Sequence, residues 1–133
     1  MTGERDLTRL VTGMRPELDR ARYVYCTVEA PAVPPGLHPV ATVAESEGLT
    51  LVLPQEEADA AGLPYTYVAG RITLRIHSAL DAVGLTAAVA GALADAGLSC
   101  NVVAGYHHDH LFVEYDRAQD ALAALHRLAV GAS

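Results

Sequence analysis

Residues 72–113 read ITLRIHSALDAVGLTAAVAGALADAGLSCNVVAGYHHDHLFV and carry the strongest periodic signals of the chain. The first residues alternate between apolar and polar, which is typical of a strand with one buried face. From Leu85 to Ala96 the apolar residues recur at the spacing of one helical face, and Gly97 ends the pattern. Residues 98–104 and 110–115 are apolar segments on either side of a polar turn. The stretch therefore predicts a strand, a helix and two antiparallel strands.

The rest of the chain fits the same plan. After residue 115 an apolar stripe predicts a last helix that runs to about residue 129. The first half predicts a helix at 5–15, a strand at 22–29, a hairpin at 40–53 and a short helix at 55–61, with a proline-rich loop at 30–39. The sequence thus predicts an α+β fold of two ferredoxin-like lobes, residues 1–64 and 65–133, with antiparallel sheets and helices packed on one face.

The composition limits which partners the chain can have. Of its 133 residues 51% are hydrophobic but only 5% are aromatic, so the core must consist mainly of Ala, Val and Leu. The formal net charge of −7 disfavours nucleic acid, because nonspecific affinity for phosphates comes from Lys and Arg. The apolar runs are much shorter than the roughly 20 residues that cross a bilayer. With Cys26 and Cys100 inside apolar segments, we expect a cytoplasmic protein with free thiols that binds no nucleic acid and no membrane.

Three segments carry a family resemblance. They are YVYCTV at 23–28, GLTLVL at 48–53 and the stretch at 72–113, in which HSALDAVGLTAAVA and SCNVVAGYHHDH are the most specific parts. In these segments the chain resembles small tandem ACT-like domain proteins of bacteria. The resemblance implies two ACT-like lobes, a regulatory fold that commonly binds amino acids between lobes or subunits. Because sheet edges left open by the predicted elements favour pairing, we expect a homodimer, and we expect no cofactor.

The resemblance also points to a ligand site. In the general ACT pattern an acidic residue and a Gly stand in the turn between the first strand and the first helix, and here Asp81 and Gly84 hold such positions. A Gly ahead of a helix lets backbone N–H groups approach a carboxylate, while an Asp nearby can hold an ammonium group. Equally, Gly84 can simply permit a tight turn while Asp81 caps the helix or faces solvent. The candidate ligand-binding residues are His77, Ser78, Asp81, Gly84, Leu85, Asn101, Val102 and Gly105.

The turn before the last strand is crowded with imidazoles. His107, His108, Asp109 and His110 follow one another there, and in a strand His108 and His110 share one face. Such side chains often only bond backbone carbonyls at a hairpin tip, and they can also contact an organic ligand. With His77 as a third ligand, His108 and His110 are candidates for a metal site, which needs three or four converging ligands.

Three functions follow from these observations. We expect a non-enzymatic regulatory or sensor protein that binds a small metabolite, an amino acid, at a lobe or subunit interface. Catalysis has little support, because neither Ser78 nor Ser99 lies in a Gly-x-Ser-x-Gly elbow. One alternative is a metal-binding protein or metal-assisted hydrolase that uses His77, His108 and His110. The other is a dimerisation module without a ligand.

Overall fold

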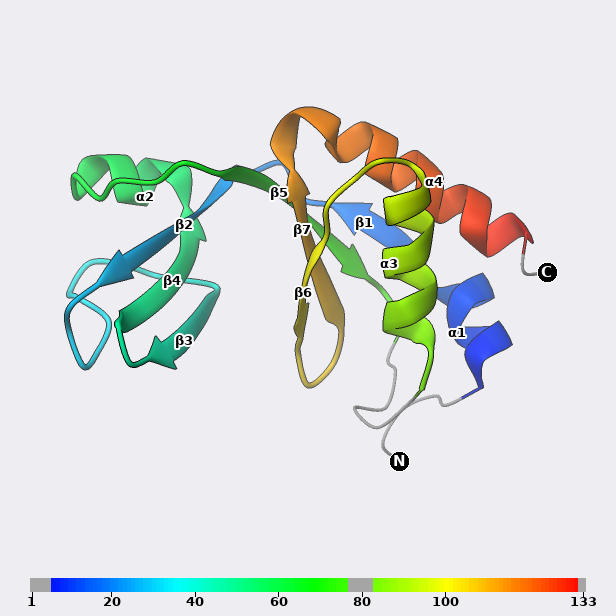
Figure 1. Cartoon of the computed structure of the whole chain (residues 1–133), viewed down its shortest axis with the longest axis horizontal. Helices are drawn as coiled ribbons and strands as arrows, with labels where there is room; N and C mark the ends of the chain where they lie inside the picture. The colour runs from blue at the N-terminus through cyan, green and yellow to red at the C-terminus, as the bar shows by residue number, and fades with distance from the viewer. Residues whose placement is uncertain (1–5, 77–82, 132–133) are drawn as a thin grey trace. The chain divides into compact units, whose positions relative to one another are not determined.

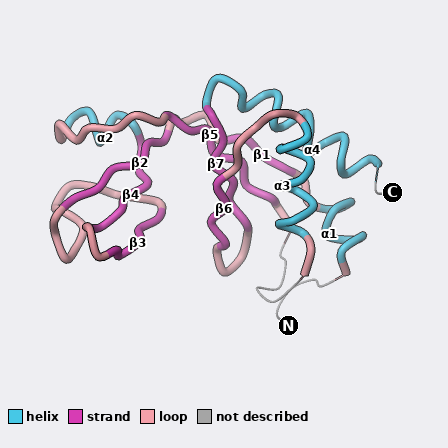
Figure 2. The backbone as a smooth tube through the Cα atoms, in the orientation of Figure 1, coloured by secondary structure: helices cyan, strands magenta, loops and turns pink. Residues whose placement is uncertain are grey.

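The computed structural model describes residues 6–76 and 83–131 and contains two compact units. Unit 2 comprises residues 20–69, and unit 1 comprises the described parts of 1–19 and 70–133. Strand β5 (Val68–Leu74) passes from unit 2 into unit 1 (Figure 2). Unit 2 is therefore an insertion within the sequence of unit 1. The division into lobes 1–64 and 65–133 stays a prediction. The two compact units are divided differently, because residues before 20 pack with the C-terminal part of the chain.

Unit 1 is built on a sheet in which β5 and β7 are the inner strands. Strand β7 lies between β5 and β6, and β1 pairs antiparallel with β5, so that Leu18 faces Ile72 and Pro16 faces Leu74. The strands are thus ordered β1-β5-β7-β6, and β1 takes the place of the fourth strand of a ferredoxin-like unit although it comes first in the chain. The elements besides β5 are α1 (Leu7–Gly13), β1 (Pro16–Leu18), α3 (Leu85–Asp95), β6 (Asn101–Ala104), β7 (Asp109–Glu114), the 3-10 turn η1 (Tyr115–Arg117) and α4 (Ala118–Gly131).

Three helices, α1, α3 and α4, cover one face of this sheet (Figure 1). Alternate residues of β5, Ile72 and Leu74, point into the core beneath the helices and are at most 1% exposed. Within the described residues no helix is long and apolar enough to span a bilayer. The helices contribute buried residues at helical spacing, namely Leu10, Val11, Leu85, Val89, Leu93, Ala118, Ala121, Ala124 and Leu125.

The C-terminal end of α3 has the geometry that the sequence indicates. Gly97 has φ +77°, in the left-handed region that favours glycine, and its N–H donates to Ala94 O at 2.9 Å. The N–H of Leu98 donates to Leu93 O at 2.9 Å. These two bonds form a Schellman motif, which satisfies the last carbonyls of the helix. They also keep Leu98 out of the following strand, so β6 begins at Asn101 rather than at residue 98.

Unit 2 is a smaller antiparallel sheet with one short helix. Its strands are β2 (Tyr23–Val28), β3 (Ala41–Glu45), β4 (Gly48–Pro54) and the start of β5, in the order β3-β4-β2-β5, and its helix is α2 (Gln55–Ala60). Val24 pairs with Leu53, and both are fully buried. The predicted hairpin and the proline-rich loop are confirmed. This loop stands in the chain where a ferredoxin-like unit has its first helix, because four prolines between residues 30 and 39 would interrupt helical hydrogen bonding.

Both cysteines are free thiols in largely apolar surroundings, as the sequence predicts. Burial is the main reason that the pKa of the Cys26 thiol lies above its usual value, with the charge of Asp59 as a second cause. Burial also raises the pKa of the Cys100 thiol. Since the thiolate is the reactive form, both side chains act as small apolar groups.

Candidate functional site

The predicted ligand-binding residues fall into three groups in unit 1. His77, Ser78 and Asp81 lie outside the described residues. Gly84 and Leu85 begin α3, while Asn101, Val102 and Gly105 belong to β6 and the turn that follows it. In Figure 1 the first turn of α3 and the β6–β7 turn both lie at the lower end of the unit.

Gly84 gives the start of α3 an uncommon backbone geometry. Its φ of +102° is in the region that only glycine adopts readily, and its carbonyl accepts the first helical bond from Ala88 N at 2.8 Å. Among the residues that the structure describes, no side chain caps this end of the helix, so its first N–H groups have no described side-chain acceptor. Leu85 is 4% exposed and packs in the core. The Leu85 side chain is therefore part of the core, and only backbone N–H groups of this turn are open to a ligand.

The residues on β6 have partners within their own hairpin. Asn101 is exposed and its Nδ2 donates to Phe112 O at 3.5 Å, across from it on β7. Gly105 closes the turn, since its N–H donates to His108 O at 2.9 Å. A Cβ atom on Gly105 would stand 2.8 Å from that same oxygen. The turn itself thus explains why a glycine is needed at residue 105.

The structure also places three polar residues that are not candidates from the sequence beside His110, which is one. On the sheet face opposite the helices, Arg71 and Thr73 of β5 and Arg75, which directly follows it, alternate with core residues. His110 on β7 lies beside them: its Nδ1 is 3.1 Å from Thr73 Oγ1 and 3.3 Å from Arg71 Nη2. The alternation of residues 71–77 marks this face as polar, but it does not reveal that β7 is the neighbouring strand.

The hydrogen bonds of His110 define its protonation state. Arginine can only donate, so Nδ1 must accept and the proton of the neutral ring lies on Nε2. Burial is the main cause that lowers the pKa of His110, and electrostatic interactions with Arg71, His108 and Arg75 lower it further. His110 is therefore a neutral hydrogen-bond acceptor that anchors the polar face of β5.

This protonation state predicts how stability depends on pH. The unfolded chain binds a proton at His110 near the ordinary histidine pKa of about 6.5, whereas the folded chain binds it only at lower pH. The His110 contribution to folding is complete above the unfolded pKa and is lost as pH falls through the folded pKa. His110→Asn keeps an acceptor near the Nδ1 position and removes the titration. We expect urea unfolding of this variant to depend less on pH between pH 7 and 5 than in the wild type.

The exposed His126 on α4 supplies the control for this measurement. His126→Asn removes one histidine without touching the sheet, so its pH dependence should match that of the wild type. Equal slopes for wild type and His110→Asn would show that the environment of His110 does not couple its proton to folding.

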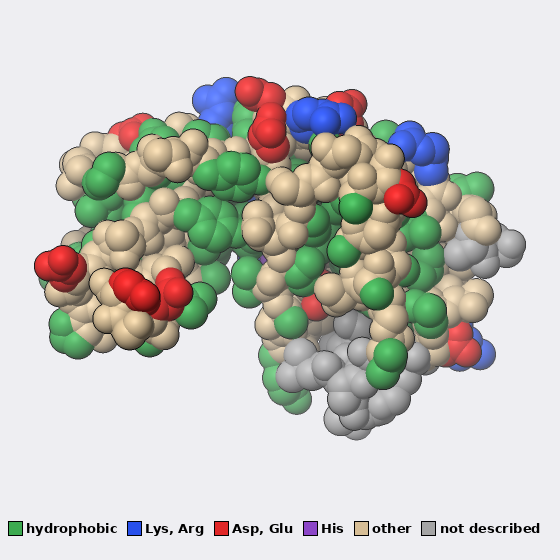
Figure 3. Space-filling view, in the orientation of Figure 1, with side chains coloured by type: hydrophobic (Ala, Val, Ile, Leu, Met, Phe, Trp, Pro, Cys, Tyr) green, Lys and Arg blue, Asp and Glu red, His purple; other side chains and the backbone are tan. Residues whose placement is uncertain are grey.

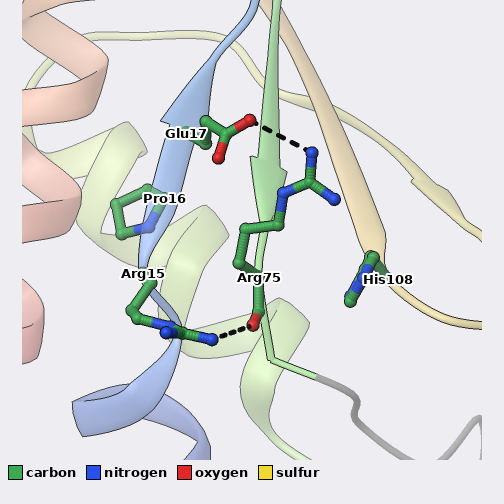
Figure 4. Close-up of a pocket in the computed structure, with 5 residues that line it drawn as sticks. All are labelled: Arg15, Pro16, Glu17, Arg75 and His108. Carbon is green, nitrogen blue, oxygen red and sulfur yellow. Dashed lines mark hydrogen bonds and ion pairs between the residues drawn. The ribbon is translucent and has the colours of Figure 1, made fainter.

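An open depression of about 490 Å³ lies on the same polar face, lined by Arg15, Pro16, Glu17, Arg75 and His108. Figure 4 shows Arg75 between β1 and His108. The guanidinium of Arg75 donates to Glu17 Oε1 at 3.1 Å, and Nη2 of Arg15 donates to the backbone O of Arg75 at 3.2 Å. Of these residues only His108 is a candidate from the sequence, because the pairing of β1 with β5, which brings Arg15 and Glu17 to this face, joins distant parts of the chain.

Acidic side chains gather elsewhere in the molecule. In Figure 3 they cluster over the β3 and β4 part of unit 2. Glu29, Glu45 and Glu47 line a second open depression there, of about 320 Å³. Considered by itself, this surface repels anions, in contrast to the arginine-lined depression of unit 1.

The metal hypothesis depends on His77, which lies outside the described residues. Between residues 6–76 and 83–131 no three His, Cys, Asp or Glu side chains are grouped closely enough to hold a metal ion. The described members of the predicted set, His108 and His110, have other surroundings: the arginine-lined depression for His108 and the Thr73 hydroxyl for His110. A metal site at His77, His108 and His110 stays a prediction.

Comparison with known proteins identifies the family. The ACT domain family matches twice, over residues 2–70 and 68–127. A crystal structure of a Vibrio cholerae protein of unknown function, described as a possible transport protein, is 50% identical and has a TM-score of 0.84, with 92% of this chain and 95% of that chain covered. No curated protein sequence matches.

More distant structures share the fold. An Agrobacterium tumefaciens protein is 17% identical with a TM-score of 0.70, covering 86% of this chain and 87% of its own. The regulatory subunit of aspartate kinase from Thermus thermophilus is 13% identical with a TM-score of 0.63, covering 85% and 95%. These similarities confirm the predicted α+β fold of two ferredoxin-like, ACT-like lobes. The chain belongs to the ACT domain family and carries two ACT matches in tandem.

Proposed function

We propose that this protein is a non-enzymatic regulator that binds an amino acid at the first turn of α3. The observation that carries the proposal is the start of α3 at Gly84, which has φ +102° and where no described side chain caps the N–H groups of the first turn. Backbone N–H groups at a helix start favour a carboxylate, because they donate hydrogen bonds and lie at the positive end of the helix dipole. The ACT family and the aspartate kinase regulatory subunit among the similar structures support a regulatory role.

The other end of the amino acid requires an acceptor for its ammonium group. We assign this role to Asp81, three residues before Gly84 in the chain, with His77 and Ser78 as further contacts. Asn101, Val102 and Gly105 are the proposed contacts from the β6 side. Binding regulates only if the ligand has different affinities for two packings of the protein.

We also propose that the protein is a cytoplasmic homodimer. Among the described strands of unit 1, β6 pairs only with β7, so its outer edge is open to a second copy of the chain. An amino acid bound near β6 would then lie at a subunit interface. The two free thiols agree with a reducing compartment.

A thermal-shift screen of the common amino acids tests the ligand. A ligand that binds only the folded state raises the free energy of unfolding by about 2.7 kcal/mol when its concentration is 100 times its Kd. We therefore expect at least one amino acid to raise the Tm at millimolar concentration. Asp81→Asn should lower the affinity for that compound by about tenfold or more, since the variant removes the partner of the ammonium group. Asp95→Asn, which removes an equal charge from the exposed end of α3, should leave the affinity unchanged. Folded protein that responds to none of the amino acids would refute the proposal.

A further inference from the structure

We propose that the arginine-lined depression of unit 1 is a second binding site, for a small anion that presents two or more oxygens on one centre. A carboxylate or a phosphate group has this chemistry. Arg15 and Arg75 would bind the oxygens and His108 would contact the same group from the β7 side. The site uses none of the residues proposed to bind the amino acid, so it goes beyond the regulatory function proposed above.

The charge of the depression sets it apart from the rest of the molecule. The chain has only 9 Lys and Arg against 16 Asp and Glu, yet two guanidinium groups and an imidazole line this one hollow beside a single described carboxylate, Glu17. Arg71 lies on the same face of the sheet, because alternate residues of a strand share a face. Guanidinium groups offer paired N–H donors that match the oxygens of carboxylates and phosphates.

Arg15 occupies a backbone position that favours glycine. Its φ of +40° makes it the one described residue other than glycine with a positive φ. The position follows the end of α1 and precedes Pro16, where a left-handed residue ends the helix and a proline prevents its continuation. A glycine would adopt this conformation with less strain, so the backbone does not account for an arginine here. Strain of this kind is found where a side chain serves a function.

The hydrogen bonds already present use only part of the donor capacity of each arginine. The bond from Arg15 Nη2 to the Arg75 carbonyl uses one of five guanidinium donors and directs the side chain across the depression (Figure 4). The ion pair of Arg75 with Glu17 is exposed on both sides, at 45% and 63% of the side chains, and such pairs are weak. Each arginine therefore keeps donors for an anion.

His108 has unused hydrogen-bonding capacity at the same place. Its Nδ1 is buried and forms no hydrogen bond with any part of the chain that the structure describes. Buried polar atoms without a partner are uncommon in folded proteins, and they call for an explanation. An anion in the depression provides one, because a ring nitrogen that carries a proton donates to an oxygen.

Isothermal titration calorimetry with inorganic phosphate and, separately, with malonate tests the site. We expect one of the two to bind the wild type, which also separates a phosphate-bearing from a dicarboxylate ligand. Arg15→Gly should lower the affinity for that anion at least about tenfold. It should not lower the Tm, because glycine suits φ +40° better than arginine. Glu17→Gln should strengthen binding a few fold, since it removes the only described carboxylate of the depression. Arg127→Gln, which removes a positive charge from the exposed face of α4, should have little effect.

Two results would overturn the site. One is that neither anion binds the folded wild type at about 10 mM. The other is that Arg127→Gln weakens binding as much as Arg15→Gly does. The anion would then respond only to the net charge of the protein and not to a specific site. Asp81 is not part of the anion site. A negative result for the anion therefore leaves the amino-acid proposal to be tested separately, by the thermal-shift screen and Asp81→Asn.

Discussion

Replacing Leu93 with alanine should lower the free energy of unfolding by about 2–5 kcal/mol. Leu93 is fully buried near the end of α3, in the core that α1, α3 and α4 form over the sheet of unit 1. The substitution removes apolar atoms and leaves a cavity that close-packed neighbours fill only in part. Because small domains are stable by only about 5–15 kcal/mol, a large part of the total stability would be lost.

Equilibrium unfolding in urea, followed by circular dichroism, measures this loss. Val130→Ala is the control, since Val130 on α4 is 75% exposed and its truncation should change stability by less than about 0.5 kcal/mol. If Leu93→Ala destabilised the protein no more than Val130→Ala, the packing of α3 against the sheet would be wrong.

Gly105→Ala should destabilise the protein by about 1–3 kcal/mol through a steric conflict in the β6–β7 turn. The new Cβ would lie 2.8 Å from the backbone oxygen of His108 and 3.2 Å from Nε2 of His110. The oxygen belongs to the main chain and accepts the bond from Gly105 N, so relief requires movement of the turn. We therefore also expect altered NMR signals for the rings of His108 and His110.

The same substitution at Gly91 provides a matched comparison. Gly91 lies on the exposed side of α3, and its added Cβ would meet no atom within 4 Å. Alanine favours the helix over glycine by about 1 kcal/mol, so Gly91→Ala should raise stability while Gly105→Ala lowers it. A neutral or stabilising Gly105→Ala would mean that the turn tolerates a side chain and that Gly105 has another role.

The main elements of the fold can be predicted from the sequence because their signals are local. The apolar spacing from Leu85 to Ala96 and the stop at Gly97 define α3, and alternation defines the face of β5. The three-residue strand β1 was not predicted. Pro16 and Glu17 show no strand pattern, and the segment is a strand only because it pairs with residues 72–74, more than fifty positions later.

The candidate site was predicted only in part for a similar reason. The sequence marked the helix start at Gly84 and the imidazoles of the β6–β7 turn, which are local features. It did not mark Arg15 or Arg75, since an isolated arginine in a sequence indicates only a solvated charge. The depression exists because β1 lies on one side of β5 and β7 on the other.

The sequence by itself determined the main helices and strands, the family and the polar character of one face of β5. The tertiary structure alone decided that residues 20–69 form an insertion and that Arg15, Arg75 and His108 line one hollow. The physical reason is that helix and strand periods are set by neighbouring residues along the chain. Strand pairing depends on which distant segments share a core, and the local pattern of a single sequence does not show which segments pair.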